Sequence, residues 1–466
     1  MKTEFLKTLD YFEKLTKIPR GSTNRAPVRD FLCAFAREKG LRYRTDSADN
    51  VVIWKAAGKG YENRSPVILQ GHTDMVCVKE EGYETDFQRE GLKLCKEGDF
   101  LFAQGTSLGG DDGIAVAMML ALLESNIAMP PLVCLFTADE EIGMIGAEAL
   151  DMSDIEGNYL INIDSEEEGV LTVSCAGGST AVLSLPYALQ QQSGYVYEIA
   201  VGGLAGGHSG MEIGKGGSNA CKVLGEVLAA LPAHALVRLE GGEKENAIAT
   251  AAKAAVLLKE PAQLQALCES IRARHIEKEP HIGIHCTGGD AAQVKATDST
   301  STAAIEAALL AMPQGVIKMS AFDEKSVQTS LNLGVIEWAP GAADFTFCVR
   351  SSVKAEREAL EKELAGIAAR AGGTITISGI YPSWEYRENS ALREAAVAVF
   401  ERLYGKKPRI EAIHAGLECG LLLEKKPELD CISIGPQMYD VHSACERLSI
   451  SSCERTMEYL VELLKF

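Results

Sequence analysis

Five clusters of histidine and acidic residues stand out in this 466-residue sequence, because they carry side chains that bind divalent metals. They are Gly71-His72-Thr73-Asp74, Gly109-Gly110-Asp111-Asp112-Gly113, Asp139-Glu140-Glu141, Asp164 and His442. So many carboxylates in one place would repel one another unless cations neutralised them. Imidazole and carboxylate are ligands that zinc, manganese and cobalt accept. The residue types therefore predict a metal site.

Four of the clusters follow short apolar runs of strand length, and the fifth, residues 109–113, opens the helix expected from residue 114. Residues 67–69 lead into the first cluster, 132–136 into the third and 160–163 into Asp164, while 431–434 precede His442. Sites in doubly wound sheets form at the carboxyl ends of the strands. Each cluster alone has an ordinary structural explanation, such as a helix N-cap. Five clusters at one edge of one sheet favour a common chemical role.

That role fits a hydrolase with two metals. Such an enzyme needs about two ligands private to each metal, a carboxylate that bridges both, and a free carboxylate that accepts a proton from the attacking water. It also needs acids that orient the imidazoles. The five clusters hold enough side chains to fill every position.

The surrounding pattern predicts the elements that bring these clusters together. Residues 5–39 have helical periodicity with a loop around 19–22, and residues 114–124 form a strong helix candidate. Together with a further strand at 51–54, they give strands that alternate with helices. This alternation predicts an α/β fold with a mostly parallel sheet that is covered on both faces.

The chain is long enough for at least two domains, and its character changes near residue 178. From about 180 to 380, strands alternate with Ala-rich helices, and few acids follow the strands. The α/β pattern resumes with helices at 391–403 and 453–464. We therefore expect a discontinuous domain of residues 1–180 and 382–466, which carries the metal clusters, and a large inserted α+β lid domain of residues 181–381.

Composition narrows the functional classes. The formal net charge of −19 argues against a nucleic-acid binder. The apolar runs are shorter than a membrane span, and the first residues do not match a signal peptide, so we expect no membrane association. The 13 cysteines are scattered without a CxxC motif, which is typical of reduced thiols. We expect a cytoplasmic protein.

The order, spacing and strand-end placement of the clusters resemble the co-catalytic zinc peptidases, which include carboxypeptidases, tripeptidases and dipeptidases. Three segments are similar to one branch, the aminoacyl-histidine dipeptidases. They are Leu160-Ile161-Asn162-Ile163-Asp164-Ser165-Glu166-Glu167-Glu168-Gly169, Gly206-Gly207-His208-Ser209-Gly210 and His414-Ala415-Gly416-Leu417-Glu418-Cys419-Gly420. The resemblance covers essentially the whole chain, including the long insertion.

This resemblance implies a metal-ligand set with two divalent ions per chain, zinc first, with manganese or cobalt as alternatives. His72 and Asp164 would hold one ion, and Glu141 and His442 the other. Asp111 would bridge the two. The neighbouring Asp112 is the alternative bridge, and a helix N-cap is its ordinary explanation.

The resemblance also implies the proton chemistry and the substrate contacts. Glu140 would act as general base and then as the acid that protonates the leaving amine, and Asp74 would hold the His72 ring. His208 would stabilise the oxyanion, from its own chain or a neighbour's, and Arg350 would bind the substrate carboxylate. Further candidate substrate-binding residues are Asn246, Asn332, His414 and Glu418, with core packing an equal alternative for the last two. His281, His285 and Cys286 suggest a third metal site less well than a lid strand.

The implied function is hydrolysis of dipeptides, with Xaa-His and carnosine-like substrates. Two alternatives stay open. One is a sister hydrolase, namely a tripeptidase, an aminoacylase or a carboxypeptidase. The other is a non-catalytic binding protein on the same fold, although no ligand or base position is missing. The partner is a small peptide, and a homodimer formed through the lid is an open alternative to a monomer.

Overall fold

The computed structural model describes residues 2–466, which divide into two compact units. Unit 1 contains residues 2–174, 386–411 and 417–466, and unit 2 contains residues 175–385 and 412–416. We expected residues 412–416 in the discontinuous domain. They belong to unit 2 because Ala176 N–H donates to the Ile413 carbonyl at 3.1 Å, and His414 Nε2 lies 2.7 Å from Ser330 Oγ.

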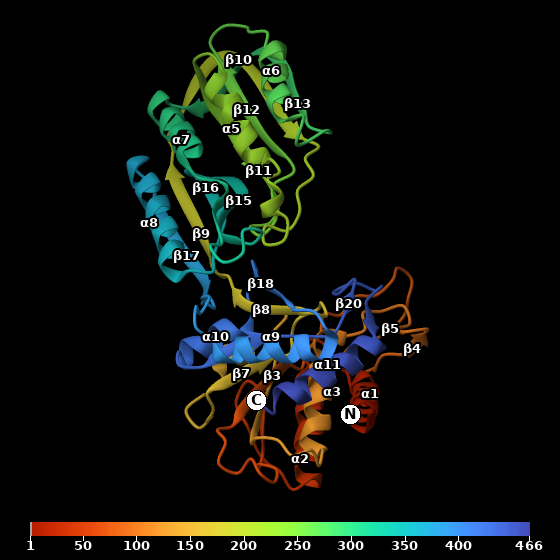
Figure 1. The fold of residues 1–466 in the computed structure, drawn as a ribbon. Helices are drawn as coiled ribbons and strands as arrows, with labels where there is room; N and C mark the ends of the chain where they lie inside the picture. The colour runs from red at the N-terminus through yellow and green to blue at the C-terminus, as the bar shows by residue number, and fades with distance from the viewer. Residues whose placement is uncertain (1) are drawn as a thin grey trace. The chain divides into compact units, whose positions relative to one another are not determined.

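Unit 1 is built around an eight-stranded sheet with the order β1-β2-β6-β3-β7-β19-β8-β18 (Figure 1). The strands are β1 Arg42–Thr45, β2 Val51–Lys55, β3 Val67–His72, β6 Leu132–Thr137, β7 Tyr159–Asn162, β8 Val170–Cys175, β18 Arg409–Ile413 and β19 Asp430–Ser433. The four adjacent strands β6, β3, β7 and β19 are parallel, whereas β1, β2 and β8 pair antiparallel. The predicted parallel sheet is therefore confirmed at the centre, with antiparallel strands added outside it.

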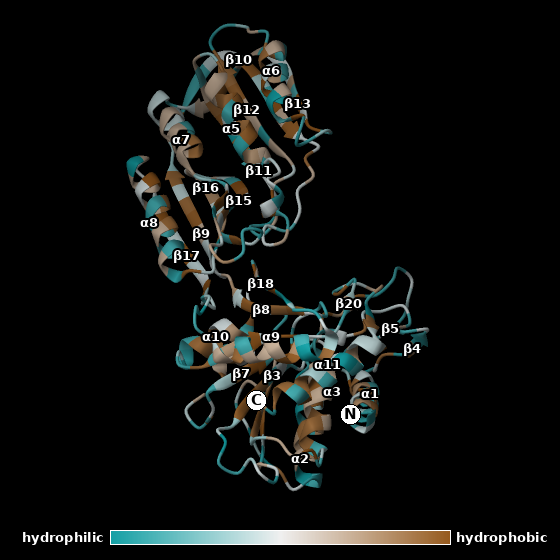
Figure 2. Cartoon of the chain, in the orientation of Figure 1, coloured by the Kyte–Doolittle hydropathy of each residue, from teal (hydrophilic) through white to brown (hydrophobic). Residues whose placement is uncertain are grey.

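Seven helices belong to unit 1. They are α1 Lys2–Thr16, α2 Ala26–Glu38, α3 Gly110–Glu124, α4 Ile145–Ala149, α9 Ala391–Tyr404, α10 Glu418–Lys425 and α11 Ile450–Leu463. Helix α3 packs against α1 and β3, and its residues 110–123 are all buried. Its residues 114–123 are all apolar, so this part of the helix is on the hydrophobic side of the scale in Figure 2. All residues of β3 and β6 are buried as well, as expected of strands covered on both faces.

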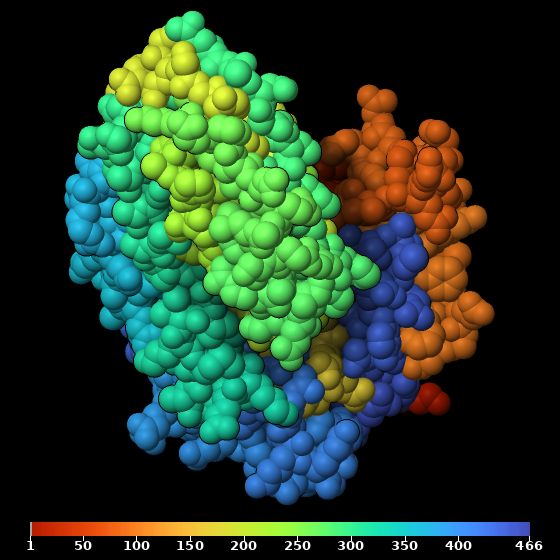
Figure 3. Space-filling model, turned by 90° about the horizontal axis from the view of Figure 1, so that it is seen from above, coloured from red at the N-terminus to blue at the C-terminus, as the bar shows by residue number. Residues whose placement is uncertain are grey.

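A small antiparallel sheet completes unit 1. Its order is β20-β21-β5-β4, and its strands are β4 Leu94–Glu97, β5 Phe100–Ala103, β20 Met438–Tyr439 and β21 Arg447–Ser449. The sheet joins the segment before α3 to the segment on either side of His442. The loop 79–90 before it is mostly exposed (orange in Figure 3).

Unit 2 contains an antiparallel sheet of nine strands with the order β13-β10-β12-β11-β15-β16-β9-β17, in which β14 also pairs with β15. The strands are β9 Gly177–Pro186, β10 Leu189–Gly202, β11 His234–Gly241, β12 Ala252–Leu258, β13 Gly283–Thr297, β14 Gly315–Met319, β15 Val327–Ala339, β16 Ala342–Ser351 and β17 Thr374–Tyr381. The helices are α5 Ala220–Ala230, α6 Gln265–His275, α7 Ser299–Ala311 and α8 Lys354–Arg370, with a 3-10 turn at Ile213–Lys215.

The core of unit 2 lies between these helices and the sheet. Burial alternates along β9 and along the first half of β16, so one face of these strands packs while the other is more open. Leu183, Phe345 and Phe347 on the strands pack in the same cluster as Leu224 of α5 and Ile305 of α7. The inserted domain is thus α+β, as predicted.

Two expectations from composition can be compared with the structure. Among residues 2–466, no helix combines the length and the apolar character that a membrane crossing requires. The 13 cysteines are all free thiols.

The N-terminus of α5 generates a prediction about the stability of unit 2. The Asn219 side chain accepts hydrogen bonds from Cys221 N–H and Lys222 N–H and donates to the Leu333 carbonyl at 2.8 Å. Asn219→Ala should lower the free energy of unfolding by about 1–2 kcal/mol, because it removes the helix cap and leaves a buried carbonyl unpaired. Urea denaturation measures the loss. Ser299→Ala, at an exposed position of α7, is the control, and equal midpoints for the two variants would contradict the prediction.

Candidate metal centre

The parallel strands of unit 1 bring the predicted clusters to one edge of the sheet. His72 is the last residue of β3, Glu140 and Glu141 follow β6, and Asp164 follows β7. Because β3 pairs in parallel with both β6 and β7, their carboxyl ends lie side by side. The structure therefore brings these side chains to the same edge of the sheet.

The donor atoms form three overlapping groups, each within 4.8 Å, that could hold metal ions. The groups are His72 with Asp111 and Asp164, Asp111 with Glu141 and His442, and His72 with Glu140 and Glu141. Asp111 Oδ1 lies 2.9 Å from His72 Nε2, and Asp111 Oδ2 lies 3.0 Å from His442 Nε2. Each oxygen of one carboxylate therefore faces a different imidazole.

The other two ligand candidates lie on opposite sides of Asp111. Asp164 Oδ1 lies 3.6 Å from His72 Nε2, and Glu141 lies 3.1 Å from His442 Nε2. The result is two donor sets, one on each side, that share Asp111. A carboxylate placed between two imidazole–carboxylate pairs matches the ligand requirements of two neighbouring divalent metals.

The electrostatics of the centre favour cations. Burial disfavours charge on His72, but Asp111, Asp164 and Asp74 outweigh it and raise the pKa of His72 well above its ordinary value. Hydrogen bonds to Asp111 and Glu141 raise the pKa of His442 to about 11. Without metal, both rings carry protons that balance the carboxylates. Metal ions would replace these protons with a larger positive charge.

Asp74 contacts both the His72 ring and the backbone of Glu140 and Glu141. It is 3% exposed, and its Oδ1 lies 3.4 Å from His72 Nδ1. It also accepts hydrogen bonds from Glu140 N–H at 3.0 Å, Glu141 N–H at 3.3 Å and Ser22 Oγ at 2.8 Å. One carboxylate therefore contacts the His72 ring and also fixes the backbone that carries the next two acids.

Glu140 is the acid at the centre whose protonation is most disturbed. Burial, followed by the nearby charges of Asp164, Glu418 and Glu141, raises the pKa of Glu140 well above its ordinary value, although His72 opposes this. A raised pKa makes a carboxyl group better able to hold a proton, which a group that first accepts and then donates one must do.

Asp111 and its neighbour Asp112 have different surroundings. Asp112 is fully buried, and its Oδ2 accepts a hydrogen bond from His72 N–H at 3.1 Å. A Cβ at Gly71 would collide with that same oxygen, so glycine is required there. Asp112 is in none of the donor groups, which favours Asp111 as the bridge.

Unit 2 holds a second cluster, made of His208, Arg350 and His414. Arg350 is 7% exposed, its Nη1 donates to Tyr381 Oη at 2.8 Å, and its Nε has no hydrogen-bond partner. Among residues 2–466, no carboxylate lies within ion-pair distance of Arg350. Burial and Arg350 lower the pKa of His208, and they lower that of His414 to about 4. A buried guanidinium without a counterion is suited to an anion.

The two asparagine candidates differ in exposure. Asn332 is 1% exposed, and its amide donates to the Glu245 and Ala247 carbonyls at 3.0 and 2.8 Å. These bonds hold the loop whose Asn246 carbonyl accepts from Ser209 N–H, beside His208. Asn246 itself is exposed. Both substrate contacts stay predictions, and burial disfavours the one at Asn332.

Glu418 lies inside unit 1 rather than on a surface. It is 0% exposed, and its Oε2 accepts hydrogen bonds from Gln70 Nε2 at 2.5 Å and Thr137 Oγ1 at 2.6 Å. Burial, opposed by His72, raises the pKa of Glu418 to about 7. His414 belongs to unit 2, so the structure does not place these two residues in one unit. Direct substrate contact by Glu418 stays a prediction that its burial disfavours.

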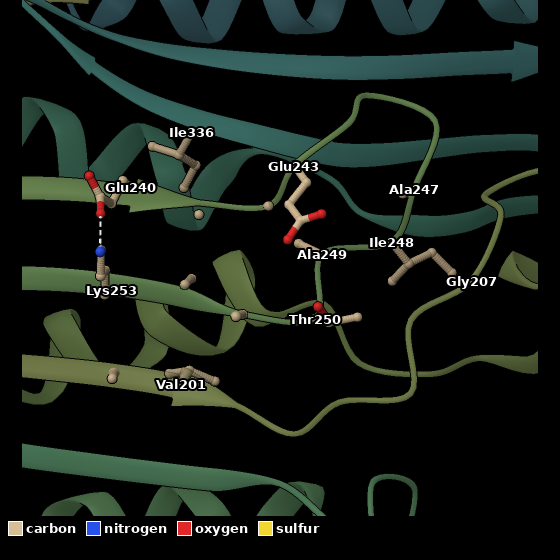
Figure 4. A pocket seen from close by; sticks show the side chains of 15 residues that line it. Val201, Gly207, Glu240, Glu243, Ala247, Ile248, Ala249, Thr250, Lys253 and Ile336 are labelled. Atoms are coloured by element: carbon tan, nitrogen blue, oxygen red, sulfur yellow. Dashed lines mark ion pairs between the residues drawn. The ribbon is translucent and has the colours of Figure 1, made fainter. Parts of the chain in front are cut away.

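Two cavities lie beside these clusters. In unit 1, a groove of about 660 Å³ is lined by Glu141 and by apolar side chains that include Met75, Phe87 and Ile142. In unit 2, a pocket of about 500 Å³ lies against the loop that follows β11 and against Gly207, which precedes His208 (Figure 4). The strand expected around His281, His285 and Cys286 is β13, which contains the last two, and none of the donor groups found among residues 2–466 includes these three residues.

Two buried charged residues that the sequence did not single out lie directly behind the metal cluster. Arg20 lies in the loop between α1 and α2, and Glu446 lies four residues after His442. Their only sequence signals were a charged residue at a helix break and an acid close to a candidate ligand. Neither signal distinguishes them from surface residues.

Comparison with known proteins identifies the family. Residues 68–465 match the profile of peptidase family M20/M25/M40. The cytosol non-specific dipeptidase of Escherichia coli is 35% identical over 473 residues, which cover 98% of this chain and 96% of that protein.

Solved structures agree. The aminoacylhistidine dipeptidase of Vibrio alginolyticus matches with a TM-score of 0.91 at 34% identity, over 98% of this chain and 96% of that one. The aminopeptidase PepT of Bacillus cereus shares the fold at 15% identity, with a TM-score of 0.56 over 99% and 98% of the two chains. The resemblance seen in the motifs is thus confirmed, and the chain belongs to peptidase family M20/M25/M40.

Proposed function

We propose that the protein hydrolyses dipeptides at a centre of two divalent metals. The observation that carries this proposal is Asp111, whose two carboxylate oxygens face two different histidines at 2.9 and 3.0 Å. Its support from relatives is a dipeptidase that is 35% identical over almost the whole chain. A non-catalytic role is disfavoured because every proposed ligand, and the proposed base, is present at the sheet edge.

His72 and Asp164 would hold one metal, Glu141 and His442 the other, and Asp111 would bridge them. Zinc fits the two imidazoles and the carboxylates, and manganese or cobalt fits as well. When bound, such metals lower the pKa of a water and polarise the scissile carbonyl. Glu140 would take the proton from that water and return it to the departing amine, while Asp74 keeps His72 and the Glu140 backbone in place.

The second cluster supplies groups for the substrate itself. Arg350 lacks a counterion, and a guanidinium binds a carboxylate through two parallel hydrogen bonds. His208 Nδ1 accepts a hydrogen bond from Gly210 N–H at 3.3 Å. In the neutral ring the proton is then on Nε2, where it can donate to a developing oxyanion. Asn246 is a further donor. We assign unit 1 as the catalytic domain and unit 2 as the lid.

The two named relatives differ in the substrate specificity that their names state. One is a non-specific dipeptidase and the other an aminoacylhistidine dipeptidase. We propose dipeptides as the substrate class, with Xaa-His and carnosine-like members included. A panel of carnosine, Gly-His, Ala-Ala, Gly-Gly-His and N-acetyl-Ala tests this. Cleavage of dipeptides alone supports the proposal, whereas cleavage of the tripeptide or the acetylated amino acid moves the protein to a sister hydrolase.

We also place the protein in the cytoplasm. The support is the name of the Escherichia coli relative, which assigns that protein to the cytosol, together with 13 cysteines that are all free thiols.

The proposed base predicts a separation of metal binding from turnover. Glu140→Gln should keep two metals per chain and lower kcat by about 10²- to 10⁴-fold, because the amide cannot accept the proton. Metal content and steady-state kinetics measure the two effects. Glu141→Gln is the matched control and should lose metal. If Glu140→Gln loses metal as readily as the control does, Glu140 is a ligand and not the base. If Glu140→Gln loses metal and Glu141→Gln keeps it, the two roles are exchanged.

The raised histidine pKa values predict how metal affinity depends on pH. Both His72 and His442 are protonated in the metal-free protein at neutral pH, and each must lose its proton to bind metal. Affinity should therefore fall as the pH falls, by up to about tenfold per pH unit for each displaced proton. Competition with a chelator of known affinity, between about pH 6 and pH 8, measures the slope. A pH-independent affinity would contradict the assignment.

The assignment of Arg350 predicts a substrate-dependent defect. Arg350→Met should raise KM for free dipeptides by about 10- to 150-fold, which corresponds to one lost charge-assisted hydrogen-bond pair. The same dipeptides with a C-terminal amide lack the negative charge, so the variant and the natural protein should hydrolyse them at similar rates. Equal losses on acids and amides would remove Arg350 from carboxylate recognition.

A further inference from the structure

Asp111 lies at the irregular start of α3, where regular helical hydrogen bonding does not fix the backbone. Gly109 has φ +64° and is the N-cap of α3, where no side chain of its own caps the helix. Asp111 and Asp112 have non-helical backbone angles although they lie in the first turn. The free N–H groups of such a helix start require partners. The position of Asp111 therefore depends on whatever binds the backbone of residues 107–112, which we call the Asp111 loop.

Glu446 binds this loop on its N–H side. The side chain is 3% exposed, and its Oε2 accepts hydrogen bonds from Leu108 N–H at 2.8 Å and Gly109 N–H at 3.0 Å. Its Oε1 accepts from Gly110 N–H at 2.7 Å, and Asp111 N–H is 3.5 Å away. One buried carboxylate thus occupies the N–H groups of consecutive residues up to Asp111. These are charge-assisted bonds at a helix N-terminus, where negative charge is favoured.

Arg20 binds the same loop on its carbonyl side. The side chain is 2% exposed, and Nη2 donates to the Gly109 carbonyl. Nη1 donates to the Thr73 and Asp74 carbonyls at 3.1 and 2.9 Å. The guanidinium therefore connects the Asp111 loop to the segment that follows His72. A second connection between these segments is the hydrogen bond from His72 N–H to Asp112 Oδ2 at 3.1 Å.

Glycines make room for the guanidinium. A Cβ at Gly109 would lie 2.5 Å from Arg20 Nη2 and 2.7 Å from Met75 Sδ, and a Cβ at Gly113 would also collide with Nη2. Arg20 donates only to backbone carbonyls, and among residues 2–466 no carboxylate lies within ion-pair distance of it. Its charge is placed within a group of acids without consuming any of their oxygens.

We propose that Arg20 and Glu446 are positioning residues of the metal centre, which hold the Asp111 loop from opposite sides so that each Asp111 oxygen faces its own histidine. This inference rests on the proposed metal function. Neither residue is in a donor group, and neither touches a proposed substrate contact. Their effect passes through backbone hydrogen bonds alone.

A merely structural role would make a different prediction. A buried charged side chain that only stabilises unit 1 would change its unfolding free energy when replaced, and would leave the metal affinity of the folded protein unchanged. Unit 1 contains matched controls of this kind. Asp430 is a buried carboxylate that accepts from Ser390 Oγ at 2.6 Å and Leu392 N–H at 3.0 Å, and Arg393 is a buried guanidinium that donates to the Arg387 and Glu388 carbonyls.

The experiment compares Glu446→Gln and Arg20→Met with the controls Asp430→Asn and Arg393→Met. Zinc dissociation constants come from chelator competition, and urea denaturation of the metal-free proteins gives their stability. All four variants should lose stability. Only Glu446→Gln and Arg20→Met should also weaken zinc binding, by about 10- to 100-fold, the usual effect of losing a group that orients ligands. Arg20→Lys, which keeps the charge and part of the hydrogen bonding, should fall between Arg20→Met and the natural protein.

Two outcomes would contradict the positioning role. If folded Glu446→Gln or Arg20→Met binds zinc within about threefold of the natural protein, or if the controls weaken zinc binding as much, the positioning role is wrong. Because either variant alone decides the matter, failure of one to fold leaves the other as the test. If the natural protein itself binds no zinc, manganese or cobalt, the proposed function fails and not only this inference.

Discussion

Concentrated negative charge at one buried sheet edge is the constraint on which the rest of unit 1 depends. Parallel strands end together, so β3, β6 and β7 deliver His72, Glu140, Glu141 and Asp164 to a single place. Burying several carboxylates there is costly unless positive charge or hydrogen-bond donors accompany them. The pKa of His72 and that of His442 are raised as a direct consequence.

Much of the surrounding structure supplies that compensation. Backbone N–H groups bind Asp74, Asp112 and Glu446, and the Arg20 guanidinium lies among them. These contacts also set the geometry, because each carboxylate that is satisfied by a backbone group fixes the loop to which that group belongs. Electrostatic compensation and ligand placement are therefore achieved by the same hydrogen bonds. In the metal-free protein, protons on His72 and His442 compensate part of the negative charge, and metal ions would take over this role.

The two units differ in the charge they offer. Unit 1 gathers acids for cations, whereas the cluster in unit 2 contains the buried Arg350 without a counterion and two histidines whose pKa values are lowered. The two clusters therefore differ in the sign of the ligand charge that each would accommodate.

Sequence patterns predicted the parts of this site that follow from regular structure. His72, Glu141 and Asp164 were found because apolar runs reveal strands, and parallel strands end at one edge. Arg20 and Glu446 were missed because their roles come from the backbone of an irregular loop, which no periodicity describes. Residues 412–416 were predicted to lie in the discontinuous domain but lie in unit 2, because their contacts, such as that of His414 with Ser330, are distant in sequence. For Glu418 the sequence left pocket lining and core packing equally open, because burial behind the sheet edge leaves no local signal.

The sequence pattern could not predict that the outer strands β1, β2 and β8 pair antiparallel, because short apolar runs such as residues 51–54 do not reveal the direction of a strand.

In the proposed centre, Asp111 bridges two metals. Anomalous diffraction at the zinc edge from crystals of the zinc-loaded protein tests it most directly. The account predicts two peaks about 3.5–4 Å apart, with one Asp111 oxygen bound to each. A single peak, or two peaks with Asp111 bound to only one of them, would contradict it.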